Sequence, residues 1–341
     1  MKYVFHRATA WSGAGSSGTS RERARGSAGA ASNLGRAYLA LGEIQKAADW
    51  LNLGLEYWRK AEEVWGEARA YYYYGDLYFT LGDLKAAGEN YQKALDRWRI
   101  SNDPNDIGNV LRSLGKVCIK RGEYTAAAIH LNEALELGRK HKQRRAQAET
   151  LSLLGQLYTA TAKSTKAIEH YQQALVVWRE ISGRGGEAAT LTGLGEAYQA
   201  MGDNQSARDY LQQALRLHRT VQAHDGEAQS LFLLARTERS LGVMTEAGRD
   251  IEAALKSVES VRASVLSQNL RATYLASVRD YYEFYIDLLL RPEHNAADAR
   301  LALHINERAS ARSLLESLGE IRTNLTQGVD ARLLARENEL Q

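Results

Sequence analysis

The chain has 341 residues, of which 44% are hydrophobic and 25% are charged, and its formal net charge is +3. This composition is that of a folded protein, and so small a net charge excludes a bulk electrostatic attraction to nucleic acid. The single cysteine, Cys118, excludes an internal disulfide framework and a multi-cysteine metal site. There are only two prolines, and the many alanine, leucine, glutamate, arginine and glutamine residues favour helix.

The chain shows no membrane or secretion signal. No apolar run reaches the roughly 20 residues that a bilayer span needs. The apolar stretch near the start, residues 3–5, is too short for a secretory signal. We therefore expect a cytoplasmic protein with no membrane partner.

The stretch WSGAGSSGTS (11–20) imitates a nucleotide-binding loop. Gly13, Gly15 and Gly18 have the spacing G-x-G-x-x-G, and Thr19 stands where a phosphate-binding loop has lysine. A functional loop follows a buried strand and opens a helix, and no such strand precedes these glycines. Their glycine- and serine-rich composition predicts a flexible lead-in over residues 1–27 instead.

From residue 28 to about residue 262 the sequence repeats every 40 residues. A glycine column consists of Gly35, Gly75, Gly115, Gly155 and Gly195. An alanine column with the same step includes Ala47, Ala87, Ala127, Ala167 and Ala207. Glycine and alanine let helix axes approach closely, so we expect both columns to lie in the packed interior.

Each unit reads as two helices joined by a short polar break. In the fourth unit, Leu151, Leu154 and Tyr158 recur at steps of three and four, which indicates one buried helical stripe. Breaks such as LGE (41–43) and LGD (81–83) contain a glycine that can adopt the left-handed conformation and end the first helix.

This pattern resembles the tetratricopeptide repeat, a helix–turn–helix unit usually 34 residues long. In the fourth unit the resemblance is carried by Leu154, Gly155, Tyr158, Ala167, Tyr171 and Ala174. The family commonly ends its second helix with proline, whereas this chain has arginine there, so the second helix can run on. The resemblance implies an all-α fold: a right-handed α-solenoid of about six repeats over residues 28–262, followed by two or three additional helices.

The resemblance also implies a binding surface, because in this family a row on the first helices lines a concave groove that holds a partner's peptide. The matching residues are Arg36, Tyr72, Asp76, Phe79, Arg112, Lys116, Gln156, Glu196 and Arg236. Their mixed chemistry is typical of a specific binding surface. Tyr72 and Phe79 offer aromatic anchors, and Arg112, Lys116 and Lys120 form a basic ladder, which would suit a partly acidic, partly aromatic peptide. A generic solvated face is the competing interpretation.

A second resemblance lies downstream of the repeats. The portions ERASARSLLESL (307–318) and QGVDARLLARE (327–337) resemble the segment that joins such repeats to the caspase-like protease domain of bacterial CHAT-family proteins. The resemblance implies long helices over 263–319 that cap the solenoid and a connector over 320–341 toward a further domain. The partner would then be a caspase-like domain of the same polypeptide.

Candidates for catalysis or metal binding are few. Cys118 stands in a tyrosine column, which predicts core packing and not a nucleophile. His130 and His170 share a column in neighbouring units, but two histidines alone fall short of a zinc site, so we expect boundary positions. The basic run RKHKQRR (139–145) could hold an anionic partner, although such runs are more often only solvated.

These observations favour a non-enzymatic protein–protein interaction scaffold with a protein or peptide partner and no cofactor. The alternative is the regulatory part of a longer caspase-like protease. RNA binding is a third hypothesis, which the near-neutral charge and the lack of a repeated base-reading pair disfavour. We expect the tryptophan column, Trp58, Trp98 and Trp178, to pack between successive second helices.

Overall fold

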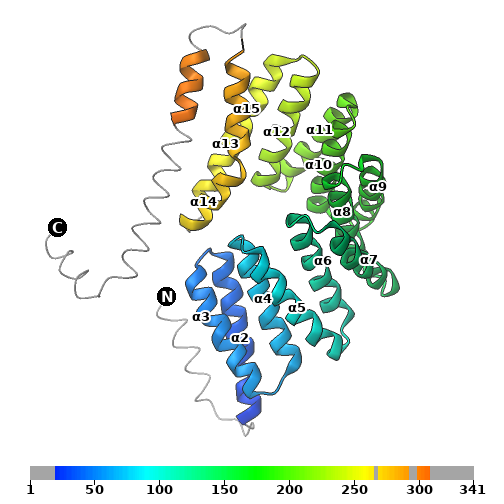
Figure 1. Cartoon of the computed structure of the whole chain (residues 1–341), viewed down its shortest axis with the longest axis vertical. Coiled ribbons are helices and arrows are strands. Elements are labelled where there is room, and N and C mark those ends of the chain that lie inside the picture. Colours follow the sequence, from blue (N-terminus) through cyan, green and yellow to red (C-terminus); the bar gives the residue numbers. More distant parts are fainter. Residues whose placement is uncertain (1–19, 265–267, 292–297, 308–341) are drawn as a thin grey trace, which may run out of the picture. The chain divides into compact units, whose positions relative to one another are not determined.

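A computed structural model describes residues 20–264, 268–291 and 298–307, and these ranges are helical apart from short turns (Figure 1). Six helix pairs follow one another: α2 (Ser20–Ala40) with α3 (Ile44–Lys60), α4 (Val64–Thr80) with α5 (Leu84–Ser101), α6 (Pro104–Lys120) with α7 (Tyr124–Lys140), α8 (Arg144–Ala160) with α9 (Ser164–Glu180), α10 (Arg184–Ala200) with α11 (Asn204–Thr220), and α12 (His224–Ser240) with α13 (Met244–Ser264). After them come α14 (Gln268–Ser277), α15 (Arg279–Leu289) and a helical segment at 298–307. The predicted all-α fold, with about six two-helix repeats followed by additional helices, is confirmed.

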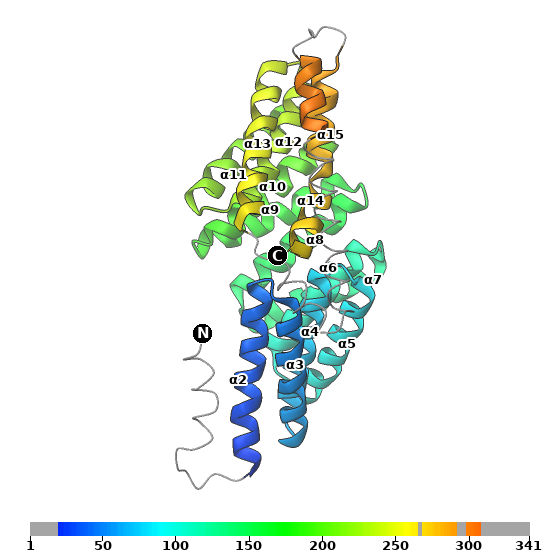
Figure 2. The ribbon, with the colours of Figure 1, turned by 90° about the vertical axis from the view of Figure 1, so that its left-hand side faces the viewer.

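Contacts between helices divide the chain into two units, residues 1–217 and residues 218–341. In the first unit the two helices of a pair lie side by side, as Figures 1 and 2 show for α2 with α3 and for α4 with α5. In the second unit α12 and α13 form such a pair, and α15 lies against α13. Within the described ranges, no helix combines the length and the apolar content that a membrane span requires.

The start of the first repeat differs from the prediction. Helix α2 begins at Ser20, so the expected flexible lead-in is wrong for residues 20–27. This segment contains arginine, glutamate and alanine, which favour helix. The Nε atom of Arg21 also donates to the carbonyl of Ala61 at 2.7 Å, which ties the first turn of α2 to the end of α3. The glycine motif before Ser20 lies outside the described residues.

The extra length of the repeat does not lie in the second helix alone. In the third and fourth repeats the first helices, α6 and α8, have 17 residues each, and so do the second helices, α7 and α9. The 40 residues are therefore shared equally between the two helices. The expectation placed all of the extra length in the second helix, whereas the two helices of these repeats are equally long.

Each link from α2 to α13 contains one residue in the left-handed conformation, 20 positions after the one before. Five of these residues are glycines with φ between 75° and 82°: Gly42, Gly82, Gly122, Gly202 and Gly242. The others have φ between 53° and 56° and are Glu62, Asn102, Lys142, Ala162, Ser182 and Gln222. Among these six residues, only Ala162 follows the first helix of a repeat. The other repeats have glycine at this position. The left-handed conformation costs a residue with a Cβ about 1–2 kcal/mol.

Ala162→Gly should therefore raise the free energy of unfolding by about 1 kcal/mol, because glycine adopts a positive φ without this strain. Gly122→Ala should lower it by a similar amount. Nothing lies within 4 Å of a Cβ at Gly122, so backbone strain would be the cause. Denaturant midpoints of the two variants and the wild type check this, and a lower midpoint for Ala162→Gly would contradict it.

The glycine column lies where the two helices of a pair touch. A Cβ on Gly35, Gly75, Gly115, Gly155 or Gly195 would come within 2.4–2.7 Å of the side chain of Leu51, Tyr91, Leu131, Tyr171 or Leu211, respectively. The alanine column, Ala47, Ala87, Ala127, Ala167 and Ala207, is fully buried. These small residues let each second helix place one large side chain directly against the backbone of the first helix.

Successive repeats of the first unit are joined by a second contact of this kind, between tryptophan and glycine. Trp58, near the end of α3, covers Gly66 in α4, and Trp178, near the end of α9, covers Gly186 in α10. A Cβ would lie 2.1 Å from the indole at Gly66 and 2.2 Å at Gly186. Trp58 also donates through Nε1 to Ser32 of α2 at 3.0 Å. These tryptophans therefore pack against first helices, and not between second helices as expected.

Gly186→Ala should destabilise the protein by about 1–3 kcal/mol, because the added methyl group overlaps the Trp178 ring. The neighbouring Gly185 is exposed with nothing within 4 Å of an added Cβ. Gly185→Ala, in the same helix, should be neutral or should stabilise by about 0.5–1 kcal/mol. Thermal unfolding of both variants tests the contact, and equal shifts in Tm would count against it.

The junction between the third and fourth repeats replaces tryptophan with polar groups. Gly138 stands in the tryptophan column, and Gln147 of α8 is buried beside it. The Nε2 atom of Gln147 donates to the carbonyl of Gly138 at 2.8 Å. Arg144 donates in turn to the Gln147 side chain at 3.0 Å. A hydrogen-bonded network therefore occupies the position that an indole ring fills elsewhere.

In the second unit, aromatic residues hold α15 against the last repeat. Tyr281 stacks on Phe232 of α12 with ring centroids 4.0 Å apart, and Phe284 meets the same ring edge-on at 5.7 Å. Arg239 donates to Asp287 at 2.7 Å. Because Tyr281 and Phe284 are buried, α15 covers apolar surface that the repeats before it would bury against a further repeat.

Candidate functional site

The residues predicted to contact a partner all lie on first helices, and we call them the first-helix row. Arg36 is on α2, Tyr72, Asp76 and Phe79 are on α4, Arg112 and Lys116 are on α6, Gln156 is on α8, Glu196 is on α10, and Arg236 is on α12. Arg236 belongs to the second unit and the others to the first. The exposed members are Arg36, Lys116, Gln156 and Arg236, and the half-buried ones are Tyr72, Asp76, Phe79 and Glu196.

Tyr72 turns its ring toward the core. The ring packs against Tyr91 and Trp98 of α5, with centroids 5.5 Å away in both cases. Its hydroxyl shares a hydrogen bond with the Ser113 hydroxyl at 3.4 Å. Burial, with the charge of Asp76, raises the pKa of Tyr72 to about 12. The prediction that Tyr72 offers an aromatic anchor is therefore corrected, because its ring is committed to packing.

Arg112 is the buried member of the row, with 9% of its surface exposed. Its guanidinium donates to Asn109 and forms an ion pair with Glu149 at 3.3 Å. Burial lowers the pKa of Arg112, and Glu149 acts in the opposite direction. The predicted basic ladder is therefore reduced to its two exposed lysines, Lys116 and Lys120.

Asp76 lies at the boundary between this surface and the core. The hydroxyl of Tyr91 donates to its Oδ1 atom at 2.7 Å. Burial raises the pKa of Asp76 to about 6, while the hydrogen bond from Tyr91 and the charge of Lys116 act in the opposite direction. The charged carboxylate is therefore held in the folded protein at a cost in stability.

This cost predicts a pH-dependent difference between wild type and Asp76→Asn, which keeps an acceptor for Tyr91. The folded-state pKa lies above the ordinary 3.8, so the penalty is present above the folded pKa and is lost as the pH falls toward 4. From pH 7.5 to 4, the free energy of unfolding of the wild type should rise relative to that of the variant. The rise should be about 1.4 kcal/mol for each unit by which the pKa of Asp76 in the folded state exceeds its pKa in the unfolded state. Denaturant titrations measure this, and a difference that does not change with pH would contradict it.

Cations lie over the aromatic rings of α4, an arrangement that the sequence analysis did not find. Arg69 lies 4.5 Å from the Trp65 ring, and Arg36 of α2 lies 5.8 Å from the Tyr73 ring. Lys120 of α6 lies 5.7 Å from the Phe79 ring. The four-residue step from Trp65 to Arg69 was visible in the sequence. The contacts between helices were not, because they depend on how α2 and α6 pack against α4.

The other candidate residues lie in packed positions. Cys118 is buried, and burial raises the pKa of its thiol. His130 and His170 are half-buried, and burial lowers the pKa of both imidazoles. His170 stacks on Tyr158 with ring centroids 5.1 Å apart. In the ranges that the structure describes, no three histidine, cysteine, aspartate or glutamate side chains are grouped to hold a metal ion.

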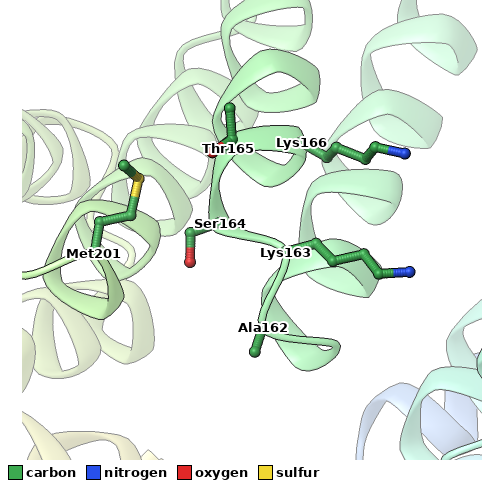
Figure 3. A pocket seen from close by; sticks show the side chains of 6 residues that line it. All are labelled: Ala162, Lys163, Ser164, Thr165, Lys166 and Met201. Carbon is green, nitrogen blue, oxygen red and sulfur yellow. The ribbon is translucent and has the colours of Figure 1, made fainter.

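Two further basic features of the first unit are not part of the first-helix row. In the run at 139–145, Arg144 pairs with Glu180 and Arg145 pairs with Glu149, so part of its charge is neutralised. A shallow depression of about 370 Å³ lies where α9 begins and is lined by Ala162, Lys163, Ser164, Thr165, Lys166 and Met201. Figure 3 shows Lys163 and Lys166 extending from the same side of this turn. We assign no ligand to either feature.

Tetratricopeptide repeat models match residues 66–140, 146–220 and 192–261, which together cover more than half of the chain. The chain belongs to the tetratricopeptide repeat family. The matches begin at residue 66, within the second helix pair. The structure adds an equivalent pair before it, α2 and α3, so the tetratricopeptide repeats extend toward the amino terminus beyond the matched segment.

Solved structures resemble the fold at low sequence identity. The apo form of RapI has a TM-score of 0.64 at 14% identity over 86% of this chain and 99% of that one. The tetratricopeptide-sensor STAND protein of Pyrococcus horikoshii has a TM-score of 0.61 at 15% identity over 90% of this chain and 45% of that one. A Rap protein complexed with competence and sporulation factor has a TM-score of 0.54 at 15% identity, over 84% of this chain and 99% of that one. No curated protein matches the chain.

Proposed function

We propose that this tetratricopeptide repeat protein is a non-enzymatic interaction scaffold that binds partner peptides on the first-helix row of its first unit. One observation carries the proposal. The packing columns repeat glycine and alanine in five units, whereas the exposed position at the same step holds Arg36, Lys116 and Gln156. Packing constrains the columns but not these exposed side chains, so their variety is available for recognition.

The resemblance to a Rap protein solved with competence and sporulation factor supports a role in binding a partner. The STAND protein, in which tetratricopeptide repeats form a sensor, supports a regulatory version of the same role. Both arguments are analogies of fold, so they support binding in general and leave the partner to be argued from the surface itself.

The proposal is tested by selecting partners from a random peptide library displayed on phage, with the full chain immobilised. Recovered peptides should bind the wild type and lose about tenfold or more in affinity for Arg36→Ala/Lys116→Ala/Gln156→Ala. The matched control, Lys85→Ala/Lys140→Ala/Gln173→Ala, removes two cations and one glutamine that are exposed on second helices. Failure to recover any peptide, or equal losses in both variants, would reject the proposed surface.

A regulatory role beside a caspase-like protease domain is a second candidate, which the CHAT-family resemblance of residues 307–318 and 327–337 favours. Apart from Glu307, both segments lie outside the described residues. A chain joined to such a domain should change the protease's rate when a peptide binds the repeats. Protease activity with and without a recovered peptide measures this, and an unchanged rate would argue against it.

A further inference from the structure

We infer that the contact between His218 and Gly226 is a pH-sensitive switch, which opens when the imidazole of His218 takes up a proton. His218 lies in the last turn of α11 and Gly226 in the first turn of α12, and both residues belong to the second unit. We call this contact the histidine junction. The proposed function concerns peptide binding on the first unit, so the switch is a separate form of regulation.

The imidazole of His218 packs directly on the backbone of Gly226. Only 5% of the surface of His218 is exposed. A Cβ added at Gly226 would lie 2.2 Å from the Cε1 atom of the imidazole and 2.3 Å from its Nδ1 atom. One repeat earlier in the sequence, Trp178 covers Gly186 in the same way. His218 therefore occupies the position that an indole ring fills in the preceding repeat.

Histidine differs from tryptophan at this position because its ring can take up a proton near neutral pH. An indole ring stays neutral, whereas a protonated imidazole carries a full positive charge. A buried charge loses its hydration, so protonation of His218 in the closed junction is unfavourable. The histidine junction is therefore sensitive to pH in a way that the contact of Trp178 with Gly186 is not.

The charged groups near His218 compensate only in part for its burial. Burial lowers the pKa of the imidazole below its ordinary value of 6.5, and the charges of Asp225 and Glu227 in α12 act in the opposite direction. Glu227 is shared with other cations. Arg219 donates to it at 2.8 Å, and the Nδ1 atom of His224 lies 3.8 Å from its carboxylate. These interactions leave the closed junction with a neutral imidazole at neutral pH.

The lowered pKa makes the closed junction less stable in acid. In the open form His218 regains its ordinary pKa of 6.5, so the open form binds a proton more readily than the closed form. The stability of the junction is fully present above pH 6.5, and it is lost as the pH falls from 6.5 toward the pKa of the closed form. Between pH 7.5 and 5.5 the population of the open form should rise by up to about tenfold.

Other titratable groups of the second unit do not open the junction in acid. Burial raises the pKa values of Asp250 and Asp280, so protonation of these carboxylates favours the folded protein. Burial and the charge of Asp225 raise the pKa of Tyr274 in α14, so its hydroxyl stays neutral over this range. The melting temperature of the whole chain combines these opposing effects. A measurement confined to α12 follows His218 itself.

The switch acts on the helix against which α15 packs. Phe232 of α12 stacks with Tyr281 of α15, with ring centroids 4.0 Å apart. Arg239, near the end of α12, donates to Asp287 of α15 at 2.7 Å. Opening of the histidine junction loosens the start of α12 and so weakens the support of α15. Acid therefore acts on the last repeat and on the helix that covers it.

The test is hydrogen exchange of the full chain at pH 7.5 and 5.5, followed by mass spectrometry of peptic fragments and corrected for the intrinsic exchange rate. Fragments of α12 from the wild type should exchange about three- to tenfold faster at pH 5.5. Fragments of α4 should not exchange faster, because Trp58 covers Gly66 there and α2 to α5 contain no histidine. An unchanged rate in α12, or an equal increase in α4, would overturn the inference.

Two replacements that do not titrate identify His218 as the group that responds. His218→Trp introduces the indole found at Trp178, and His218→Gln keeps a polar side chain that cannot overfill the site. In both variants the increase in exchange of α12 between pH 7.5 and 5.5 should fall below about twofold. Circular dichroism melts at pH 7.5 establish which variants are folded. A folded variant that keeps the wild-type increase would reject the switch.

His224→Gln is the matched control. His224 is exposed, lies six residues after His218 and approaches the same Glu227 carboxylate. Its imidazole is already in contact with solvent, so its protonation requires no opening of the junction. The variant should keep the increase in exchange of α12 within about twofold of wild type. Loss of the increase would assign the response to the ion pair of His224 and would reject the burial of His218 as its cause.

Discussion

The close approach of the two helices in each repeat depends on a missing side chain. Leu51 and Tyr91 occupy the space that a Cβ on Gly35 or Gly75 would take, and the same contact recurs in the following repeats. Because the second helix fills this space, the opposite face of the first helix is not needed for packing within the pair. The chemistry of that face can therefore differ from repeat to repeat while the core stays constant.

Periodicity predicted most of the architecture, because each packing requirement returns at the same step. The six pairs, the links and the left-handed glycines all follow from columns such as that of Gly155 and Ala167. The start of α2 could not be predicted in this way. Residues 20–27 precede the repeat columns, and the contact of Arg21 with Ala61 that ties the first turn of α2 to the end of α3 is visible only in three dimensions.

The candidate site was predicted less well, for a geometric reason. Tyr72 and Tyr73 are adjacent in sequence but about 100° apart around α4, so one packs on Trp98 while the other lies beneath Arg36. Sequence spacing alone does not determine how the helix is rotated about its axis. Arg112 shows a related difficulty, because its burial depends on how α6 packs beside α8, where it pairs with Glu149, and this packing is not visible in the sequence.

The equal division of the repeat has a consequence for how such a chain can evolve. From α6 to α12, helices of 17 residues alternate with three-residue links, and one residue in twenty adopts positive φ. A single inserted residue within a helix would rotate everything beyond it by about 100° and pull the tryptophans away from their glycines. Within the helices, a change of length therefore keeps each large side chain packed on its glycine only when a whole repeat of forty residues is gained or lost.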